Sequence, residues 1–364
     1  MKVSEICKYA PKSNIKARDA CDGGKYVFFT SSADESKRYN AYQHEGEGII
    51  MGTGGNATLH YYDGKYAVST DCIVLLPNEQ IRCKYLYYFF LGNMRVLERG
   101  FKGAGLKHTN KGYIGDIDIG DIPSFERQEK IIGIFDTLQS IIDLRKSEIE
   151  RLDNLIKARF VEMFGSPVSN PMSWEKRTLK EVCIKLNDGS HFSPESFETG
   201  DYKYVTAKNI KFSGFDFSNI TYVPEAVHRP IFDRCNPEFE DVLYIKDGAT
   251  TGVAIVNTLD EEFTLLSSVA LLKQDRSIMN GYFLATLLNN KDMYLNIRNN
   301  MGGAAITRLT IAKLNAIEII VPPIELQNQF ADFVRQVDKS KVAVQKALDE
   351  TQTLFDSLMQ EYFG

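Results

Sequence analysis

The stretch that decides the fold runs from residue 123 to residue 165 and reads PSFERQEKIIGIFDTLQSIIDLRKSEIERLDNLIKARFVEMFG. No proline follows Pro123 in this stretch, and its only internal glycine is Gly133, near the start. Long or apolar side chains recur at alternating steps of four and three residues: Leu138, Ile142, Arg145, Ile149, Leu152, Ile156, Arg159 and Met163. This spacing predicts one long helix whose seam packs along another helix.

The predicted partner helix lies in the same chain. Residues 322–364 repeat the pattern 199 positions later, with Pro322 in place of Pro123. On the first helix we expect packing through Leu138, Ile142, Ile149, Leu152 and Ile156. On the second helix we expect packing through Val337, Val344, Leu348, Phe355 and Leu358. Because the two registers match within one chain, we expect one copy per complex rather than a homodimer built on this helix.

The repeat extends to the segments before each helix. Gly46–Asn56 reads GEGIIMGTGGN and Glu240–Gly252 reads EDVLYIKDGATTG, so in both places an apolar strand runs into a glycine-rich turn. A second strand and a helix rich in aromatic or leucine side chains follow each turn. We therefore expect two globular units of mixed α/β (α+β) structure with mainly antiparallel sheet. The predicted parts are globular units 1–121 and 166–321 and spacer helices 122–165 and 322–364.

Length, charge and cysteine content narrow the class of protein. The chain has 364 residues, of which 43% are hydrophobic, enough for two or three globular units. Its net charge of −5 argues mildly against a general nucleic-acid binder, although local basic patches can still hold DNA. The six cysteines form no CxxC pair, as expected of buried thiols in a reducing cytoplasm. We expect no signal peptide, because no hydrophobic segment follows the basic residues of the N-terminal stretch MKVSEICKYAPKS. We expect no membrane span, because no apolar run approaches about 20 residues.

Polar, basic and aromatic side chains gather in both predicted globular units. Amide, hydroxyl and cationic groups are those that read base edges and hold phosphates. The candidates for DNA contact in the first unit are Ser31, Ser32, Lys37, Arg38, Tyr39, Asn56, His60, Lys107, His108, Asn110 and Lys111. Those in the second unit are Ser190, His191, Lys203, Lys208, Asn209, Lys211, Lys246, Thr250, Thr251, Arg298 and Arg308. For any one of them a solvated surface role is the alternative, and only the pattern in both units favours DNA.

The sequence leaves four other interpretations to consider. Gly52–Ala57 matches the GxGxxA form of a dinucleotide fingerprint, but a predicted hairpin at Tyr62–Lys65 follows it where the fingerprint needs a helix. Asp22, Glu35 and Lys37 could be read as a magnesium-dependent nuclease site, although the pattern is short. The histidines show no HxH or HExxH spacing, so we expect no metal site. A two-domain scaffold that binds no nucleic acid is the remaining alternative.

The ordered set of motifs resembles the DNA-specificity subunit of type I restriction–modification enzymes, and the resemblance covers the whole chain. Pro123–Gln128 and Pro322–Gln327 look like the family's P-P-x-x-E-Q helix start. Glu240–Gly252 is similar to its G-D-I-L strand with a glycine-rich turn, and Asp188–Pro194 is similar to its D-G-x-H-x-x-P stretch. Tyr26–Ser32 also looks like part of a target-recognition domain.

This resemblance implies an adaptor that reads double-stranded DNA and has no catalytic residues, metal or cofactor of its own. Each globular unit would be a target-recognition domain for one half of a bipartite target. The two helices would pack antiparallel and hold the units apart with an internal pseudo-two-fold repeat. Two modification subunits would dock on the chain, bind S-adenosylmethionine and methylate adenine, and restriction subunits would add ATP- and Mg-dependent cleavage. We expect a cytoplasmic protein with no membrane contact.

Overall fold

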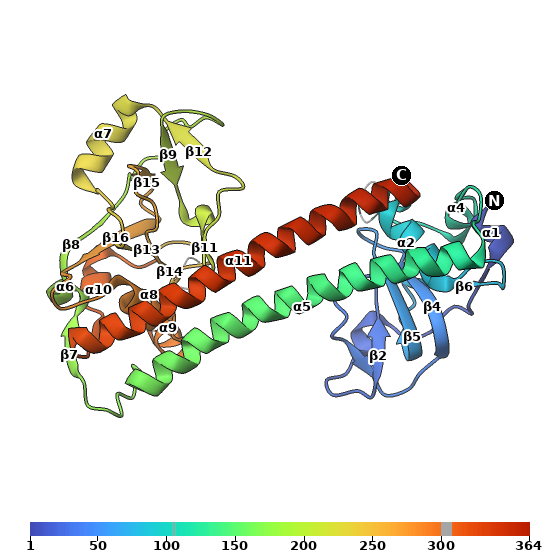
Figure 1. Ribbon diagram of the computed structural model, residues 1–364, viewed down its shortest axis with the longest axis horizontal. Coiled ribbons are helices and arrows are strands. Elements are labelled where there is room, and N and C mark those ends of the chain that lie inside the picture. The colour runs from blue at the N-terminus through green and yellow to red at the C-terminus, as the bar shows by residue number, and fades with distance from the viewer. Residues whose placement is uncertain (104, 106, 300–307) are drawn as a thin grey trace. The chain divides into compact units, whose positions relative to one another are not determined.

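The computed structural model describes residues 1–103, 105, 107–299 and 308–364. These residues form two compact units, whose elements are labelled in Figure 1. Unit 1 consists of residues 1–147 and 345–364, and unit 2 consists of residues 148–344. This grouping differs from the four consecutive parts expected from the sequence, because each unit includes part of both long helices.

Unit 1 is built on a six-stranded sheet with the order β1-β6-β4-β5-β2-β3. Its strands pair antiparallel, apart from β2, which pairs parallel with β5. The strands are β1 Cys7–Tyr9, β2 Tyr26–Phe29, β3 Arg38–Tyr39, β4 His44–Gly52, β5 Leu59–Val68 and β6 Cys72–Pro77. The shorter helices are α1 Val3–Ile6, η1 Ala17–Asp19, α2 Cys83–Gly92, α3 Met94–Arg99 and α4 Lys111–Gly115.

The hairpin expected at Tyr62–Lys65 is wrong. These residues lie inside β5, where Asp63 and Gly64 pair with Glu47 and Gly46 of β4. Asp-Gly is the usual sequence of a tight turn, but here Gly64 sits in mid-strand with a φ of 143°. The long pairing of β4 with β5 therefore overrides the local turn preference.

Unit 2 contains a four-stranded sheet, β14-β13-β16-β8, a three-stranded sheet, β12-β9-β15, and the two pairs β10-β11 and β17-β7. Its strands pair antiparallel, apart from β15 with β9. The strands are β7 Glu175–Thr178, β8 Cys183–Asp188, β9 Tyr202–Val205, β10 Ile210–Lys211, β11 Gly214–Phe215, β12 Thr221–Val223, β13 Val242–Ile245, β14 Ala254–Val256, β15 Thr264–Leu265, β16 Val269–Gln274 and β17 Glu318–Val321. The shorter helices are α6 Leu179–Val182, η2 Ala207–Asn209, α7 Glu225–Arg234, α8 Gly281–Asn289, α9 Lys291–Asn299 and α10 Ile311–Asn315. Mixed, mainly antiparallel units are thus confirmed.

Strand β13 shows why the apolar run before the glycine-rich turn is continuous. Val242 and Tyr244 belong to one buried cluster, whereas Leu243 and Ile245 belong to another. Successive side chains of a strand point to opposite faces, so a strand buried on both faces needs no polar residues. Tyr244 is fully buried, and burial raises the pKa of its hydroxyl. The glycine-rich turn begins directly where this buried strand ends.

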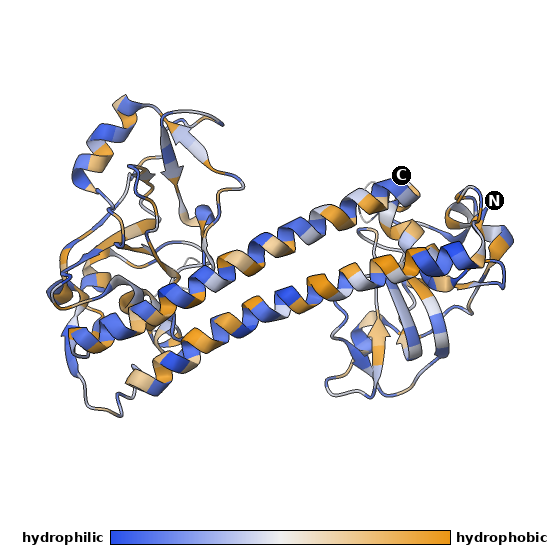
Figure 2. Cartoon of the chain, in the orientation of Figure 1, coloured by the Kyte–Doolittle hydropathy of each residue, from blue (hydrophilic) through white to orange (hydrophobic). Residues whose placement is uncertain are grey.

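The two long helices confirm the predicted repeat. Helix α5 is Phe125–Phe164 and helix α11 is Ile324–Phe363, with 40 residues each. In unit 1 the start of α5 meets the end of α11, where the Phe135 ring centre lies 5.3 Å from Phe355 and 5.8 Å from Phe363. In unit 2 the end of α5 meets the start of α11, with Phe160 lying 5.6 Å from Phe330. Both pairings are antiparallel, and Figure 2 shows apolar residues recurring along both helices.

The residues predicted to pack along the two long helices differ in how deeply they are buried. Those buried are Leu138, Ile142, Val337, Leu348 and Phe355. Those only half-buried are Ile149, Leu152, Ile156, Val344 and Leu358. Charged contacts supplement the apolar ones, since Lys341 Nζ lies 2.7 Å from an oxygen of Asp153. The Arg145 guanidinium donates to the Ala347 carbonyl and the Thr351 hydroxyl.

A buried glutamine anchors the first turn of each long helix. The Gln128 amide accepts a hydrogen bond from Arg82 N at 2.8 Å and donates to Pro123 O at 2.9 Å. The Gln327 amide accepts from Asn280 N at 3.0 Å and donates to the carbonyls of Pro322 and Ile278. Arg82 and Asn280 are the N-cap residues of α2 and α8. One amide therefore joins the start of the long helix to the start of a shorter one in both units.

Replacing Gln327 with alanine should destabilise unit 2 by roughly 2–3 kcal/mol, because the variant leaves several buried backbone groups without a partner. Urea denaturation would measure the loss, and hydrogen exchange should show faster exchange at the Asn280 amide. The control is Gln336→Ala, an exposed position on the same helix, where we expect a change within about 0.5 kcal/mol. Equal effects of the two substitutions would contradict the anchoring role.

Candidate nucleic-acid interface

Each unit holds its glycine-rich turn in the same way. Residues 53–57, called turn A, follow β4, and residues 246–252, called turn B, follow β13. Thr109 N donates to Thr53 O at 3.0 Å in unit 1, and Leu309 N donates to Lys246 O at 2.9 Å in unit 2. Isolated bridges join Gly54 to His108 and Asp247 to Arg308. The segment that precedes α4 or α10 therefore supports the turn in both repeats.

Turn A brings together side chains from three loops of unit 1. The Ser31 hydroxyl donates to Asp71 O at 2.6 Å and lies 3.3 Å from Thr53 N, from which it accepts. Gly55 N donates to Lys107 O at 3.0 Å. The predicted candidates whose segments meet at this turn are Ser31, Asn56, Lys107 and His108. Ser32 follows Ser31, and its hydroxyl accepts from Asp34 N at 3.1 Å. Asn56, Lys107 and His108 are exposed, so turn A presents an amide, an ammonium and an imidazole to solvent.

His60 is a correction to the predicted set. The imidazole is buried, with Nδ1 2.6 Å from an oxygen of Glu35 and Nε2 3.1 Å from Ser32 O. Its ring also packs on Phe29, with 5.1 Å between the ring centres. A side chain held on both nitrogens beneath the surface supports the loop that carries Ser31 and Ser32 and does not reach a base.

The other unit 1 candidates lie on two segments of the chain, residues 37–39 and residues 110–111. Lys37 Nζ donates to the Thr30 hydroxyl at 3.1 Å, and the Arg38 guanidinium donates to two carbonyls of its own loop. The Tyr39 ring lies 5.4 Å from the Phe28 ring. The remaining two candidates, Asn110 and Lys111, are exposed at α4, where Asn110 caps the helix and Lys111 lies over the Tyr9 ring.

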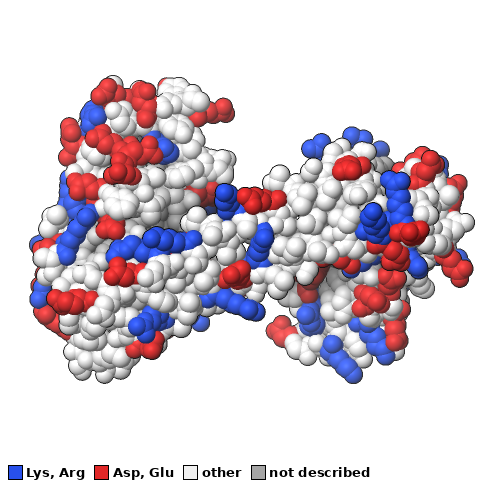
Figure 3. Space-filling model, in the orientation of Figure 1, with Lys and Arg blue, Asp and Glu red and all other residues white. Residues whose placement is uncertain are grey.

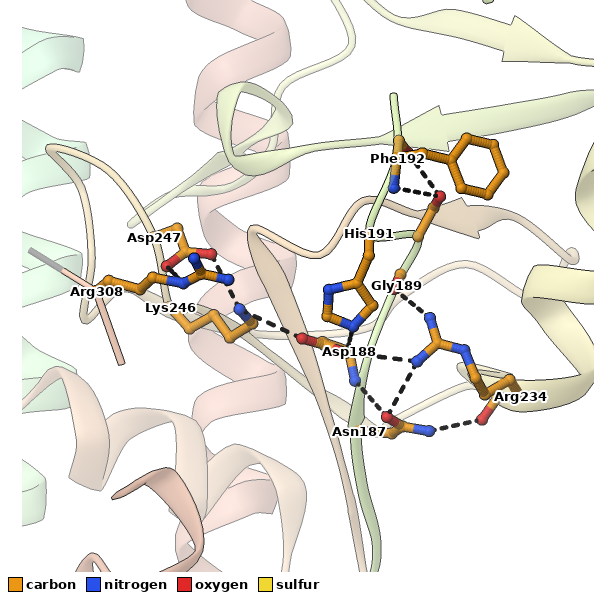
Figure 4. A network of polar contacts seen from close by, with 10 residues as sticks. Asn187, Asp188, Gly189, His191, Phe192, Arg234, Lys246, Asp247 and Arg308 are labelled. Atoms are coloured by element: carbon orange, nitrogen blue, oxygen red, sulfur yellow. Dashed lines mark hydrogen bonds and ion pairs between the residues drawn. The ribbon is translucent and has the colours of Figure 1, made fainter. Parts of the chain in front are cut away.

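In unit 2 a network of charged side chains holds turn B, with Lys246 and Asp188 buried at its centre (Figure 4). Lys246 is only 2% exposed, and its Nζ lies 3.3 Å from Asp188 and 2.9 Å from Asp247. Asp188 also lies 3.1 Å from His191 Nε2 and 3.5 Å from the Arg234 guanidinium. Arg308 Nε lies 3.2 Å from Asp247. The network joins the end of β8, the end of β13, helix α7 and the segment before α10, which fixes turn B from several sides.

The predicted residues around turn B fall into two groups, those buried in contacts that support the turn and those whose side chains face solvent. Lys246, Ser190 and Thr251 are buried, which corrects their assignment as DNA contacts. The Ser190 hydroxyl donates to Phe192 O at 2.6 Å, and the Thr251 hydroxyl donates to Gly248 O at 2.6 Å. The presented candidates are His191, Thr250 and Arg308, which are exposed, and Arg298, which is half-buried and donates to Thr251 O.

The remaining unit 2 candidates surround the β10–β11 pair. Asn209 is buried and is a further correction, because its amide accepts from Thr206 N at 3.0 Å and donates to Asp216 O at 3.2 Å. Lys203 is engaged by Glu261. Lys208 and Lys211 are exposed, and Lys211 Nζ lies 4.0 Å from Asp216. These two lysines remain available to phosphates.

Asp188, Asp247 and Arg234 are the residues that sequence reasoning missed. Asp188 begins the stretch DGSHFSP, of which only Ser190 and His191 are predicted as DNA contacts. Its 4% side-chain exposure is what makes it the centre of the network. A buried carboxylate needs cationic or hydrogen-bonding partners, and those partners come from distant parts of the chain. The D-G-x-H spacing was the only signal for this residue.

The magnesium nuclease alternative finds no support in the described part of the chain. Glu35 is bonded to His60 and Lys37 to Thr30. Among the described residues, no three His, Cys, Asp or Glu side chains come together in a way that could hold a metal ion. Burial raises the pKa of the Cys7 thiol to about 12 and that of Cys72 to about 11. These thiols are therefore protonated near neutral pH and are poor nucleophiles or ligands.

The distribution of charge and the hydropathy of the helices further restrict the kinds of partner that the described residues can bind. On the face that Figure 3 shows, Lys and Arg are mixed with Asp and Glu rather than gathered in one basic area. This mixture agrees with the net charge of −5 and places any DNA attraction in local groups such as those at turns A and B. Within the described residues, none of the helices has the length and apolar character that a bilayer crossing requires.

Two repeats of one α+β frame, each with polar and cationic groups on a supported glycine-rich turn, define a duplicated recognition protein. Comparison with known families agrees. The family described as "Type I restriction modification DNA specificity domain" matches residues 1–154 and 171–351. The chain therefore belongs to this family.

Individual relatives are distant. The chain is 24% identical over 157 residues to the type I restriction enzyme EcoDI specificity subunit of Escherichia coli, a match that covers 43% of this chain and 34% of that protein. It is 22% identical over 326 residues to the MjaVIII specificity subunit of Methanocaldococcus jannaschii, which covers 83% and 76%. The chain thus matches about a third of the length of the first relative and three quarters of the second.

Solved structures share the fold. The crystal structure of a type I restriction–modification S subunit from M. genitalium has a TM-score of 0.68, at 16% identity, over 100% of this chain and 95% of that one. A second, from work on the assembly and conformational transition of the type I R-M system, has a TM-score of 0.51 at 16% identity, over 100% and 96%. At this identity, the likeness shows that the fold is shared and leaves the residues of the interface to be argued from this chain.

Replacing Lys246 with methionine should destabilise unit 2 by about 3–5 kcal/mol, because the change leaves Asp188 and Asp247 without the ammonium between them. The double variant Asp188→Asn/Lys246→Met should recover at least about 1 kcal/mol, since it removes one of the two carboxylates that lose their buried ammonium partner. Urea denaturation would measure both changes. Strictly additive effects of the two substitutions would show that the buried pair is not coupled.

Proposed function

We propose that this chain is the specificity subunit of a type I restriction–modification complex and reads a bipartite double-stranded DNA target. The target-recognition domains are residues 1–121 and 166–321. The observation that carries the proposal is the repeated support of turns A and B beside exposed polar and cationic side chains. Family membership favours DNA as the ligand. The chain itself performs no chemistry in this proposal.

The two half-sites should differ in sequence. Turn A presents Asn56 and His108, whereas turn B presents Thr250 and Arg308. An amide favours adenine, a guanidinium favours guanine, and a hydroxyl contacts several bases. Turns A and B have the same kind of backbone support but present different side chains. The two units should therefore share one backbone arrangement and prefer different bases.

The spacer helices 122–165 and 322–364 would set the gap between the half-sites. Helices α5 and α11 each run for 40 residues, or about 60 Å at 1.5 Å per residue. A stiff connection restricts which pairs of half-sites can be bound together, as dimer geometry does in other DNA-binding proteins. The pairing of α5 with α11 inside one chain supports a single copy of this subunit per complex.

The partners follow from the same proposal. Two modification subunits bind the chain, carry S-adenosylmethionine and methylate adenine in the target. Restriction subunits, in a system that has them, add ATP- and Mg-dependent translocation and cleavage. The complex acts on DNA in the cytoplasm. The chain needs no cofactor for recognition, since hydrogen bonds and phosphate contacts are sufficient to read a sequence.

Mapping methylated adenine in cells with and without this gene tests the proposal directly. We expect a split motif with a gap of fixed length to lose its methylation when the gene is deleted. Identical methylation in the two strains would refute the proposal. Failure to bind any duplex with the methyltransferase present would favour the two-domain scaffold, and cleavage of DNA by the purified chain with magnesium alone would favour the nuclease.

Substitutions at the two turns should separate the half-sites. Asn56→Ala should relax the methylated motif in one half only, and Thr250→Val should relax it in the other half, each by about 1–3 kcal/mol of base discrimination. Methyl-adenine sequencing of cells that carry each variant would measure this. Each variant serves as the control for the other, and a change in both halves from one substitution would contradict independent reading.

A further inference from the structure

The β10–β11 hairpin carries an exposed phenylalanine at its tip. Lys211 pairs with Gly214, so the loop of the hairpin consists of Phe212 and Ser213. Gly214 has a φ of 117°, a conformation that suits glycine and lets the chain turn tightly. The Phe212 side chain is 63% exposed. The fold therefore holds a large apolar ring in solvent at the end of a short, ordered hairpin.

The tip lies beside turn B. The Phe212 ring centre is 6.0 Å from that of Tyr294 on α9. Tyr294 in turn packs so closely on Gly252 that an added Cβ there would come within 2.5 Å of its ring, and it lies beneath the Arg298 guanidinium. Tyr294 thus joins the hairpin tip to turn B through direct packing.

Three cations lie near the hairpin, one of which, Lys211, lies 4.0 Å from Asp216. Lys208 precedes β10, Lys211 ends it, and both are exposed. Arg298 adds a third cation on the Tyr294 side. An exposed ring contributes little to the stability of the fold, whereas a ring flanked by ammonium groups is suited to a polyanion with aromatic bases.

Unit 1 lacks this feature at the corresponding place. Strands β2 and β9 each pair with one parallel and one antiparallel neighbour. The segment that leads from β2 to β3, residues 30–37, reads TSSADESK and, although fully described, contains no strand. The segment from β9 to β12 contains the hairpin instead. The aromatic tip is therefore particular to the second reader.

We propose that Phe212 is a wedge that inserts at a base step of the half-site read by unit 2, while Lys208 and Lys211 hold the flanking phosphates. The proposal rests on the DNA-reading function given above and adds an asymmetry to it. Apolar side chains inserted between bases unstack the step and bend the duplex. Flexible pyrimidine–purine steps deform most easily, so the wedge also selects for deformable sequence in that half.

The test uses the full chain with its methyltransferase partner and a duplex that carries the split motif identified by methylation mapping. 2-Aminopurine, whose fluorescence rises on unstacking, replaces bases of each half in turn, away from the methylated adenine. We expect a rise in one half only with the unchanged protein. Phe212→Ala should abolish this rise and weaken binding by roughly tenfold, as loss of one stacked base does. Phe212→Trp should retain both.

Phe239→Ala is the matched control, because Phe239 is also exposed but lies before β13, at the opposite end of that strand from turn B. It should bind and fluoresce as the unchanged protein does. Wild-type fluorescence and affinity in Phe212→Ala would overturn the wedge. A second result would also overturn the wedge. If Phe212→Ala loses affinity without any change in fluorescence, and the unchanged protein loses the same affinity when one thymine of the duplex is replaced with uracil, Phe212 contacts the thymine methyl group and does not unstack bases. Absence of binding by the unchanged complex would instead refute the proposed function.

Discussion

The buried glutamine at the first turn of each long helix is the interaction on which the rest of the structure depends. An amide in the interior must satisfy its oxygen and its nitrogen, and Gln128 and Gln327 do so with backbone groups. The amide oxygen accepts from the N-cap residue of a shorter helix, and the amide nitrogen donates to the proline just before the long helix, so each glutamine ties the start of the long helix to the start of the shorter one. A displaced register would leave these groups unpaired, at a cost of about 1–3 kcal/mol each.

From that shared frame, the two repeats support their glycine-rich turns with different chemistry. Turn A rests on neutral hydrogen bonds, in which Ser31 joins Asp71 and Thr53. Turn B rests on charges, with Lys246 between Asp188 and Asp247. Buried ion pairs are seldom efficient stabilisers, but they require specific partners and so restrict the conformations that a loop can adopt. The two repeats thus hold their turns in a similar backbone arrangement with different side-chain chemistry.

The long-range repeat could be predicted from the sequence because a helix seam and a strand before a glycine turn are local patterns. The sequence predicts spacer helices at 122–165 and 322–364 from proline positions and apolar spacing, and the structure has helices at Phe125–Phe164 and Ile324–Phe363. Burial of polar side chains could not be predicted, since His60, Asn209 and Lys246 find their partners in other segments. The turn predicted at Asp63-Gly64 is wrong for a related reason, since the pairing of these residues with β4 outweighs their local preference for a turn. The candidate interface therefore consists of the exposed members of the predicted clusters at turns A and B. Only the three-dimensional contacts distinguish these exposed residues from the buried ones that hold the turns.

The division of the long helices also decides how each unit is completed. Phe363, next to the end of the chain, packs on Tyr85, Phe89 and Phe135 in the core of unit 1. Phe164, its counterpart 199 positions earlier, packs on Phe283, Phe330 and Trp174 in unit 2. Unit 1 therefore depends on residues that follow the whole of unit 2 in the sequence. Closing so long a loop costs little more entropy than closing a moderate one, because the cost grows only with the logarithm of its length. The end of α11 therefore completes the core of unit 1, although the sequence of unit 2 lies between it and the rest of that core.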